Sequence, residues 1–325
     1  MPEHRVTLQD IESAARQLQG IAVETPLLPC PELDGLAGGH VLLKPECLQR
    51  TGSFKIRGAY NLMSRLGDDE KAAGVVAWSS GNHAQGVAAA GQLLGIKTAI
   101  VMPEDAPQSK IENTRRLGGE TILYDRYTGD REQIARELAA ERGASLVPSY
   151  DHVHIIAGQG TVGLEIMQQC GDAAPDQVLV CCSGGGLVAG CAVAIRALHS
   201  DTAVYAVEPA GFDDTARSLA AGERQTNDPA ARSICDALLA PTPGKLTFEI
   251  NRELLAGSLV VTDDEVRDAM RFALRELKLV VEPGGAVALA AVLAGRVDCR
   301  DRTTVVVISG GNVDARQFAR IQEAG

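Results

Sequence analysis

The stretch that decides the fold is Gln177-Val-Leu-Val-Cys-Cys-Ser-Gly-Gly-Gly-Leu-Val-Ala-Gly190. It opens with an apolar run without alternation, which is typical of a parallel strand buried on both faces. Three glycines then lead into a helix; glycines let backbone amides approach a ligand, and the amino end of a helix attracts negative charge. The stretch therefore predicts a phosphate seat at residues 183–187. A plain strand-to-helix turn is the alternative, although it needs one glycine rather than three.

Short β-branched runs alternate with longer amphipathic segments from about Leu42 to Ile308. This pattern predicts the α/β class, with open, mostly parallel sheets flanked by helices. We expect strands at residues 41–44, 74–78, 98–102, 120–123, 177–182, 203–208, 258–261 and 303–308. We expect helices at residues 53–66, 82–94, 108–117, 130–142, 161–169, 187–198, 263–277 and 285–293, preceded by a helix that Thr7 caps and that reaches about Gln19.

The composition excludes several classes of protein. The chain has 325 residues, which at about 150 per domain favours two domains. Hydrophobic residues make up 45% of it, and no apolar run approaches the roughly 20 residues that a membrane span needs. The net charge of −11 opposes binding to nucleic acid. The cysteines have no C-x-x-C or zinc-type spacing, so we expect reduced thiols and, without a secretory signal, a cytoplasmic protein.

A lysine occupies an unusual place in Thr51-Gly-Ser-Phe-Lys-Ile-Arg-Gly58. Lys55 falls in the first turn of an expected helix that Ser53 can cap. The positive end of a helix disfavours a charged amine, so we expect a lowered pKa and a neutral amine able to form a Schiff base. An ordinary surface lysine is the alternative.

Two further groups of polar residues follow expected strands. Ser79, Ser80, Gly81, Asn82 and His83 bring hydroxyl, amide and imidazole groups to a helix start, which suits a carboxylate or, more simply, a helix cap. At the end of the last strand, a serine at 309 is placed to bond a ring nitrogen of a cofactor, or only to cap the strand end.

The segment Gly158-Gln-Gly-Thr-Val-Gly163 fits the G-x-G-x-x-G pattern of dinucleotide sites and is expected to open a helix. Its context argues against a nucleotide. No confident strand precedes it, and about 20 residues further on lies Cys182-Ser-Gly184 instead of an acid that binds ribose. We therefore expect no nucleotide here.

A phosphate loop, an activated lysine, a carboxylate seat and a partner for a ring nitrogen are the parts of a pyridoxal phosphate site. The chain resembles the fold-type II pyridoxal-phosphate enzymes of the threonine/serine dehydratase and serine racemase group over nearly its whole length. The resemblance rests on Thr25-Pro-Leu, Lys44-Pro-Glu-Cys-Leu-Gln, Ser53-Phe-Lys-Ile-Arg-Gly, Ser79-Ser-Gly-Asn-His-Ala-Gln-Gly, Ile156-Ala-Gly-Gln-Gly-Thr, Ser183-Gly-Gly-Gly-Leu, Glu282-Pro-Gly-Gly-Ala and Ser309-Gly-Gly-Asn-Val-Asp.

This resemblance implies a two-domain fold like that of the tryptophan synthase β chain. Residues 1–73 and 148–325 would form the large domain that binds pyridoxal 5'-phosphate, and residues 74–147 a small mobile domain. It also implies roles for single residues. Lys55 would form the Schiff base, and Phe54 would flank the ring. Asn82 would bond the cofactor's hydroxyl, and Ser309 would bond its ring nitrogen. The phosphate would be held by Ser183, Gly184, Gly185, Gly186 and Leu187, and the substrate carboxylate by Ser79, Ser80, Gly81, Asn82 and His83.

The implied chemistry is loss of water from a β-hydroxy amino acid, giving a 2-oxo acid and ammonia, because a neutral partner such as Ser309 leaves elimination favourable. Threonine and serine are the leading substrates. Serine racemase is an alternative, since Ser80 matches the second acid/base of racemases. Another is 3-hydroxyaspartate dehydratase, in which Arg131 would bind the extra carboxylate. An amino-acid sensor that lacks activity is the alternative from a different class.

The resemblance finally implies a divalent cation, Mg²⁺ or else Ca²⁺ or Mn²⁺. Its ligands would be the carboxylates of Glu208 and Asp214 and the backbone carbonyl of Phe212, since hard oxygen ligands suit such ions. A solvated acidic loop is the alternative. Members of the family are usually oligomers, so a homodimer or homotetramer is expected.

Overall fold

The computed structural model describes residues 5–79, 81–125 and 128–323. Its strands form two sheets, and every one of the expected strands is present. The strands are β1 (Leu28–Pro29), β2 (His40–Pro45), β3 (Val75–Trp78), β4 (Thr98–Pro103), β5 (Glu120–Tyr124), β6 (Ser145–Leu146), β7 (Gln177–Cys181), β8 (Ala203–Pro209), β9 (Gly257–Val261) and β10 (Thr303–Ile308).

Helices cover both sheets and are more numerous than expected. They are α1 (Leu8–Leu18), α2 (Pro31–Ala37), α3 (Lys55–Met63), α4 (Asp68–Ala73), α5 (Asn82–Leu94), α6 (Gln108–Arg116), α7 (Arg131–Arg142), α8 (Val153–Cys170), α9 (Gly186–Leu198), α10 (Asp214–Ala221), α11 (Lys245–Leu254), α12 (Asp263–Arg275), α13 (Pro283–Leu293) and α14 (Ala315–Glu323), with short 3-10 turns at Glu46–Leu48, Arg50–Gly52 and Asp236–Leu238. Thr7 caps α1 in the expected capping box with Asp10. Within the described residues, no helix is both long and apolar enough to cross a membrane.

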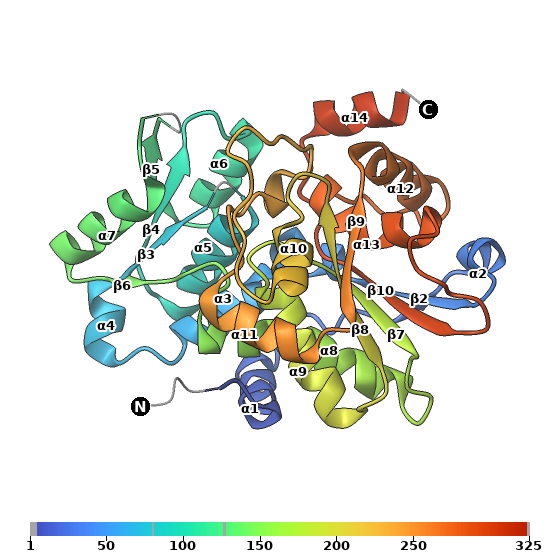
Figure 1. Cartoon of the computed structure of the whole chain (residues 1–325). Helices are drawn as coiled ribbons and strands as arrows, with labels where there is room; N and C mark the ends of the chain where they lie inside the picture. The colour runs from blue at the N-terminus through green and yellow to red at the C-terminus, as the bar shows by residue number, and fades with distance from the viewer. Residues whose placement is uncertain (1–4, 80, 126–127, 324–325) are drawn as a thin grey trace.

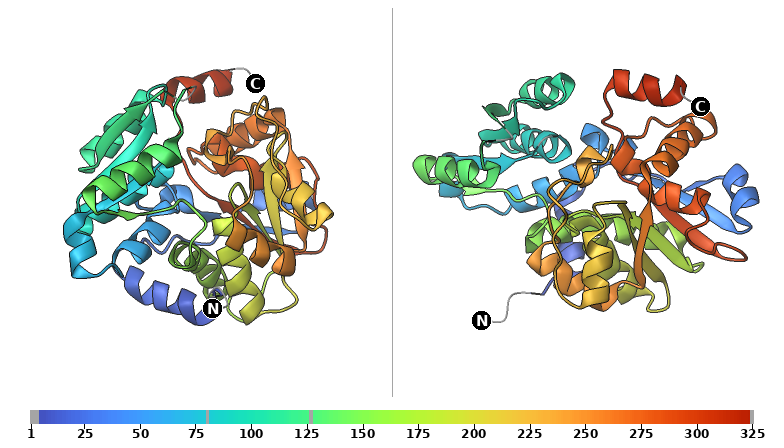
Figure 2. Two further views of the ribbon diagram at one scale, coloured as in Figure 1. Left: turned by 60° about the vertical axis from the view of Figure 1, so that its left-hand side comes forward. Right: turned by 45° about the horizontal axis from the view of Figure 1, so that its top comes forward.

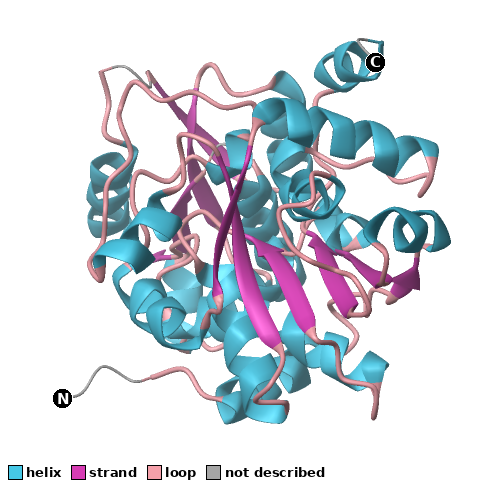
Figure 3. Cartoon of the chain, turned by 45° about the vertical axis from the view of Figure 1, so that its right-hand side comes forward, coloured by secondary structure: helices cyan, strands magenta, loops and turns pink. Residues whose placement is uncertain are grey.

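The larger sheet has the strand order β1-β2-β10-β7-β8-β9. Its neighbouring strands are parallel except for β1, which is antiparallel to β2. The inner strands β7 and β10 are buried almost throughout, as their unbroken apolar sequences predict. Figure 3 shows these strands side by side with helices around them.

The smaller sheet lies between residues 75 and 146 and has the parallel order β5-β4-β3-β6. Successive side chains of its strands point to opposite faces. Val75, Ala77 and Ile100 pack with residues of α5, whereas Val76 and Val101 pack with residues of α7. The two α/β units lie beside each other (Figures 1 and 2).

Helix α8 explains the apparent dinucleotide motif. Residues 158–163 lie inside this helix of 18 residues and do not open it, so the expected helix start at this motif is wrong. The glycines allow close helix packing instead. A Cβ on Gly158 would lie 2.6 Å from the carbonyl of Arg57 on α3, and one on Gly163 would lie 2.8 Å from the Cα of Cys191 on α9.

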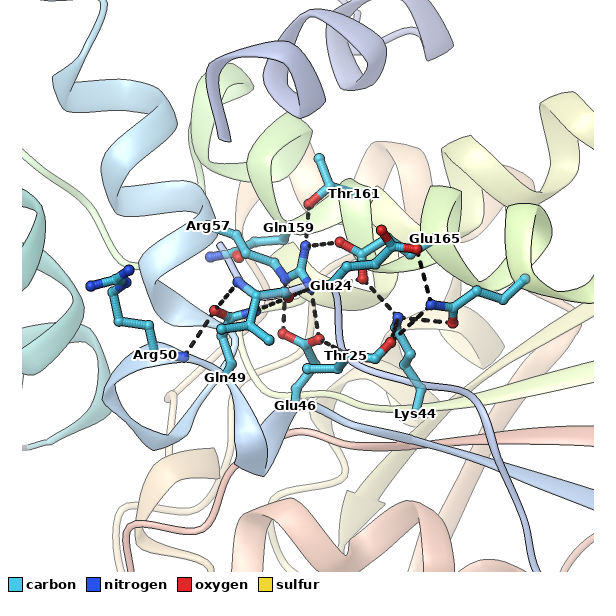
Figure 4. A network of polar contacts seen from close by, with 12 residues as sticks. Glu24, Thr25, Lys44, Glu46, Gln49, Arg50, Arg57, Gln159, Thr161 and Glu165 are labelled. Carbon is cyan, nitrogen blue, oxygen red and sulfur yellow. Dashed lines mark hydrogen bonds and ion pairs between the residues drawn. The ribbon is translucent and has the colours of Figure 1, made fainter. Parts of the chain in front are cut away.

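Helix α3 connects to the larger unit through a buried charge network (Figure 4). The guanidinium of Arg57 donates to both carboxylate oxygens of Glu46 at 2.8 Å and to Glu165 at 2.9 Å. Lys44 Nζ donates to Glu165 at 2.7 Å and to the carbonyl of Thr25 at 2.6 Å. Two cations and two carboxylates balance, so no net charge is buried.

Candidate active site

A cavity of about 530 Å³ lies at the carboxyl ends of β3, β7 and β10. Ligands bind at such strand ends in open α/β sheets. The cavity is lined by residues of both α/β units, among them Lys55, Asn82, Tyr150, Glu282 and Ser309. Except for Ser80, which lies outside the described residues, every predicted cofactor and substrate residue lines it.

Lys55 is the first residue of α3; it is half-buried and lines the cavity. Nζ donates to the carbonyl of Ser149 at 3.0 Å and lies 5.1 Å from the centre of the Phe54 ring. Burial lowers the pKa of Lys55 to about 8. The predicted lowering is therefore present, and burial is its principal cause.

Ser53 does not cap this helix. The N-cap is Phe54 without a side-chain bond, and among the described residues Ser53 Oγ, although buried, has no hydrogen-bond partner. The backbone of Ser53 instead bridges to Gly310, and the amide of Phe54 donates to the carbonyl of Ser309 at 3.2 Å. These contacts fix the start of α3 against the end of β10.

The glycine loop, residues 183–187, joins β7 to α9. Gly185 has φ +93°, a left-handed conformation that favours glycine, and it is the N-cap of α9. The Tyr150 side chain packs against Gly184, and the hydroxyl of Thr247 donates to the Gly184 carbonyl at 2.6 Å. The amino end of α9 therefore faces the cavity, and the contacts with Tyr150 and Thr247 hold the loop backbone in place.

Asn82 begins α5 and already has polar partners. Its amide nitrogen donates to Glu282, and its oxygen accepts from Asn312 Nδ2 at 2.8 Å. Burial raises the pKa of Glu282 to about 7, and within the described residues its second oxygen, Oε2, has no hydrogen-bond partner. A buried carboxylate oxygen without a partner beside Asn82 is therefore available to a ligand's donor group.

His83 is held away from the charged state. Its Nε2 lies 2.9 Å from the carbonyl of Val147, an acceptor, so Nε2 carries the proton and donates. Burial and, secondarily, Lys55 lower the pKa of His83 to about 3. The imidazole is therefore neutral, and any carboxylate seat here depends on the other groups of residues 79–83. One of these, Ser79 Oγ, accepts from the Gly81 amide at 3.1 Å.

Ser309 follows β10 directly and is buried. Burial raises the pKa of the neighbouring Cys181 thiol, at the end of β7, to about 11, and the Ser309 hydroxyl offsets part of this rise. Two polar groups from neighbouring strand ends thus meet opposite Lys55. Ser309 thus offers a neutral hydroxyl to a ligand in the cavity, and the Glu282 carboxylate lies close by, against Gly310.

The smaller unit supplies cations to the cavity. Arg131, the first residue of α7, lines it, and within the described residues no ion pair of Arg131 is found. Arg136 pairs with Glu132, and Lys110 on α6 pairs with Asp236 from the segment that follows α10. Arg131 therefore keeps its charge available to an anionic group.

Sequence reasoning gave no role to Lys110, Asp236 or Glu282. Lys110 appears in the sequence as a lysine on a polar helix, and Asp236 lies in a stretch without clear periodicity. The structure places both at the cavity. Only Glu282 had a local signal, the Glu-Pro-Gly-Gly motif.

Glu208 and Asp214 lie together at the start of α10. Glu208 accepts from the amides of Thr215 and Ala216 at 2.8 Å each and from the Ser258 hydroxyl at 2.9 Å. Burial, and then the neighbouring Asp214, raise the pKa of Glu208 to about 7, and burial raises that of Asp214 to about 6. Asp214 Oδ2 is buried and has no partner among the described residues. Among all the residues that the structure describes, no group of three or more His, Cys, Asp or Glu side chains is placed to hold a metal.

The chain is similar to known proteins over most of its length. The family described as "Pyridoxal-phosphate dependent enzyme" matches residues 18–310. The chain is 43% identical to L-threo-3-hydroxyaspartate ammonia-lyase from Pseudomonas sp, covering 96% of this chain and 97% of the relative, and 41% identical to L-threonine ammonia-lyase from Thermotoga maritima, covering 98% and 79%. The structure of maize serine racemase matches with a TM-score of 0.93 and 36% identity, covering 99% of this chain and 98% of that one.

The matched region contains Lys55, the glycine loop and Ser309, so the family assignment and the cavity agree. The predicted α/β fold, with two mostly parallel sheets, is confirmed. The chain is a lyase that belongs to the pyridoxal-phosphate-dependent enzyme family, in the fold-type II group that includes ammonia-lyases and serine racemases.

Proposed function

We propose that this enzyme removes water from a β-hydroxy amino acid and releases a 2-oxo acid and ammonia, with L-threonine and L-serine as leading substrates. The observation that carries the proposal is the amine of Lys55, which is enclosed in the cavity with a pKa of about 8. A neutral amine is both the group that binds a carbonyl cofactor and a base able to take a proton from carbon.

The residues present fit pyridoxal 5'-phosphate. The glycine loop would hold the phosphate, Ser309 would bond the ring nitrogen, Phe54 would flank the ring and Asn82 would bond the ring hydroxyl. Two observations support this fit: the left-handed Gly185 at the amino end of α9, and the buried Glu282 oxygen without a partner among the described residues beside Asn82. When bound, the cofactor supplies an electron sink that makes the Cα–H bond of an amino acid acidic.

The chain's own residues would bind the substrate and transfer protons. Residues 79–83 would hold the substrate carboxylate with the hydroxyl and amide groups at the start of α5. Lys55 Nζ would take the proton from Cα and return it to the β-hydroxyl, which leaves as water. The enamine that remains hydrolyses in water to the 2-oxo acid and ammonia. The hydrolysis consumes one water for the one that the elimination releases, so the net reaction converts the amino acid into a 2-oxo acid and ammonia.

Arg131 favours a second candidate substrate, 3-hydroxyaspartate. It lines the cavity, and no ion pair occupies it among the described residues. A guanidinium can bind a second carboxylate through two parallel hydrogen bonds. The relative from Pseudomonas sp carries this activity in its name.

The test measures release of 2-oxo acid by the holoenzyme from L-threonine, L-serine, D-serine and the isomers of 3-hydroxyaspartate, with chiral chromatography of the remaining serine. Turnover of threonine or serine supports the main proposal. Turnover confined to hydroxyaspartate, with a KM that rises at least about tenfold in Arg131→Ala while kcat changes little, assigns the second candidate. Inversion of serine without 2-oxo acid overturns both and indicates a racemase, for which Ser80 would be the second acid/base.

The proposal includes Mg²⁺, or Ca²⁺ or Mn²⁺, at Glu208, Asp214 and the carbonyl of Phe212. Two buried carboxylates with raised pKa values, one having an oxygen without a partner among the described residues, support a cation that would relieve their repulsion. Addition of EDTA should lower the melting temperature by a few degrees, since a ligand at a hundred times its Kd stabilises by about 2.7 kcal/mol. An unchanged melting temperature with no calorimetric binding of Mg²⁺ would exclude the site.

Assembly and compartment are also part of the proposal. We propose a homodimer or homotetramer in the cytoplasm, on the resemblance to the family and on the cysteines, none of which forms a disulfide with another described residue. Light scattering coupled to size-exclusion chromatography measures the oligomeric state. Fluorescence microscopy of a tagged chain shows the cellular compartment.

A further inference from the structure

The segment between α10 and α11 forms part of the active-site wall. It has little regular structure apart from the turn Asp236–Leu238. Residues 236–242, here called the wall segment, line the cavity without interruption. Since few regular backbone bonds hold these residues, their position depends on side chains from elsewhere.

Asn227 holds the wall segment from one side. It is 5% exposed. Its amide donates to the Pro241 carbonyl at 2.8 Å, and its Nδ2 donates to the Ala240 carbonyl at 2.9 Å. The same Nδ2 donates to Asp214 Oδ1 at 2.6 Å, and Arg217 donates to Oδ1 of Asn227. One carboxamide therefore joins the wall segment to the Asp214 carboxylate.

The glycine loop holds the wall segment from the other side. The amide of Ala240 donates to Ser183 Oγ at 3.1 Å. Both backbone polar groups of Ala240 are thus used, the carbonyl by Asn227 and the amide by the first residue of the glycine loop. An unbroken path of hydrogen bonds runs from Asp214 through Asn227 and Ala240 to Ser183.

We infer that Asn227 is a positioning residue that couples the Glu208/Asp214 pair to the seat of the cofactor's phosphate. The inference rests on the proposed function, because it takes the glycine loop as that seat and the pair as the cation site. A cation that engages the free oxygen of Asp214 fixes the carboxylate whose other oxygen holds Asn227. Residues that orient a metal ligand in this way usually matter to affinity by about 10- to 100-fold.

The experiment measures the dissociation constant of pyridoxal 5'-phosphate, by fluorescence of the holoenzyme during dilution, with MgCl₂ and with EDTA. In the natural protein, Mg²⁺ should lower this constant about tenfold. In Asn227→Ala the constant should rise about tenfold in EDTA and no longer respond to Mg²⁺. Asp228→Ala is the matched control, because this neighbouring exposed carboxylate bonds the nearby amide of Ala230.

The outcomes separate the two proposals. A natural protein that binds no Mg²⁺ by calorimetry, together with a weakened cofactor in Asn227→Ala, rejects the cation site and keeps Asn227 as a positioning residue of the wall. A variant that binds the cofactor like the natural protein, with and without Mg²⁺, overturns the inference. An enzyme that binds no pyridoxal phosphate at all rejects the proposed function itself, and the inference with it.

A second measurement needs no variant. Hydrogen exchange of the peptide that contains Ala240 should slow when Mg²⁺ is added to the holoenzyme, while exchange in α4, far along the chain, should stay unchanged. Equal exchange at Ala240 with and without bound Mg²⁺ would overturn the coupling even if Asn227→Ala does not fold.

Discussion

The amine of Lys55 has two close neighbours, the carbonyl of Ser149 and the ring of Phe54, and lies in a partly buried position that lowers its pKa. Desolvation disfavours the ammonium form, so with a pKa of about 8 the neutral amine becomes the main form above pH 8. Among the described lysines that line the cavity, Lys110 pairs with Asp236 and Lys245 is exposed, whereas Lys55 donates to a backbone carbonyl.

Lys55→Ala should lower 2-oxo acid release by about 10³-fold or more, because a base and covalent attachment are lost together. Steady-state assay of the purified variant with added cofactor checks this. Lys97→Ala, at an exposed lysine, is the control and should keep full activity. Activity of the Lys55 variant near that of the natural enzyme would reject the assignment.

Capture of the cofactor by the cofactor-free protein should speed up about tenfold between pH 7 and pH 9. The reason is that the neutral fraction of an amine with a pKa of about 8 rises over this interval. Stopped-flow absorbance measures the rate. The same pKa shift affects stability. Between about pH 8 and pH 10.5 the amine of the unfolded chain, with a pKa of 10.5, holds more protons than the amine of the folded chain, so the contribution of Lys55 to the free energy of unfolding rises with pH over this range. A rate that is flat in pH would mean that burial does not control this amine.

At the scale of elements, helix α8 shows why glycines stand at fixed positions. A Cβ on Gly160 would lie 2.7 Å from Ile11 Cδ1 and 2.9 Å from the carbonyl of Gly190, so α1 and α9 leave no room for it. Glycine lowers the intrinsic helix propensity of α8 but allows α1 and α9 to approach it closely.

Gly160→Ala should therefore destabilise the protein by about 1–3 kcal/mol through overpacking. Gly35→Ala in α2 is a matched control: nothing lies within 4 Å of its added Cβ, and alanine in a helix should stabilise by about 0.5–1 kcal/mol. Denaturant unfolding followed by circular dichroism compares the two. Equal effects of both substitutions would contradict the packing argument.

Several elements were predictable because their signals are local. The strand and glycines of residues 177–190 and the capping box at Thr7 consist of neighbours in sequence. The wall segment and α11 were not predictable. Asp151 accepts from the amides of Lys245, Leu246 and Thr247, which lie 94 to 96 positions away, and Asn227 binds backbone carbonyls. Backbone partners leave no pattern in a sequence.

At the scale of the whole molecule, the charge network in Figure 4 joins α3 to the chain before β2 and to α8. It anchors the helix that carries Lys55 to the larger unit, while residues of both units line the cavity. The predicted mobility of residues 74–147 is compatible with this arrangement, because the network lies outside those residues.

Arg57→Met should destabilise the protein by about 3–5 kcal/mol, since Glu46 and Glu165 would then share only Lys44 as a buried counter-charge. Arg136→Met is the control, because its pair with Glu132 is exposed and worth at most about 1 kcal/mol. Melting temperatures of both variants check the difference. Similar small losses of stability in both variants would show that the buried charge network stabilises the protein no more than the exposed Arg136–Glu132 pair does.

The bond from Lys55 to Ser149 has a consequence for the evolution of the pocket. The amine uses the backbone oxygen of residue 149, and Ser149 is also among the residues that line the cavity. Substitution at 149 thus changes the shape and polarity offered to a substrate and keeps the lysine's hydrogen-bond partner in place. New substrate preferences can be selected at this position, by nature or in a mutant library, without loss of the reactive group.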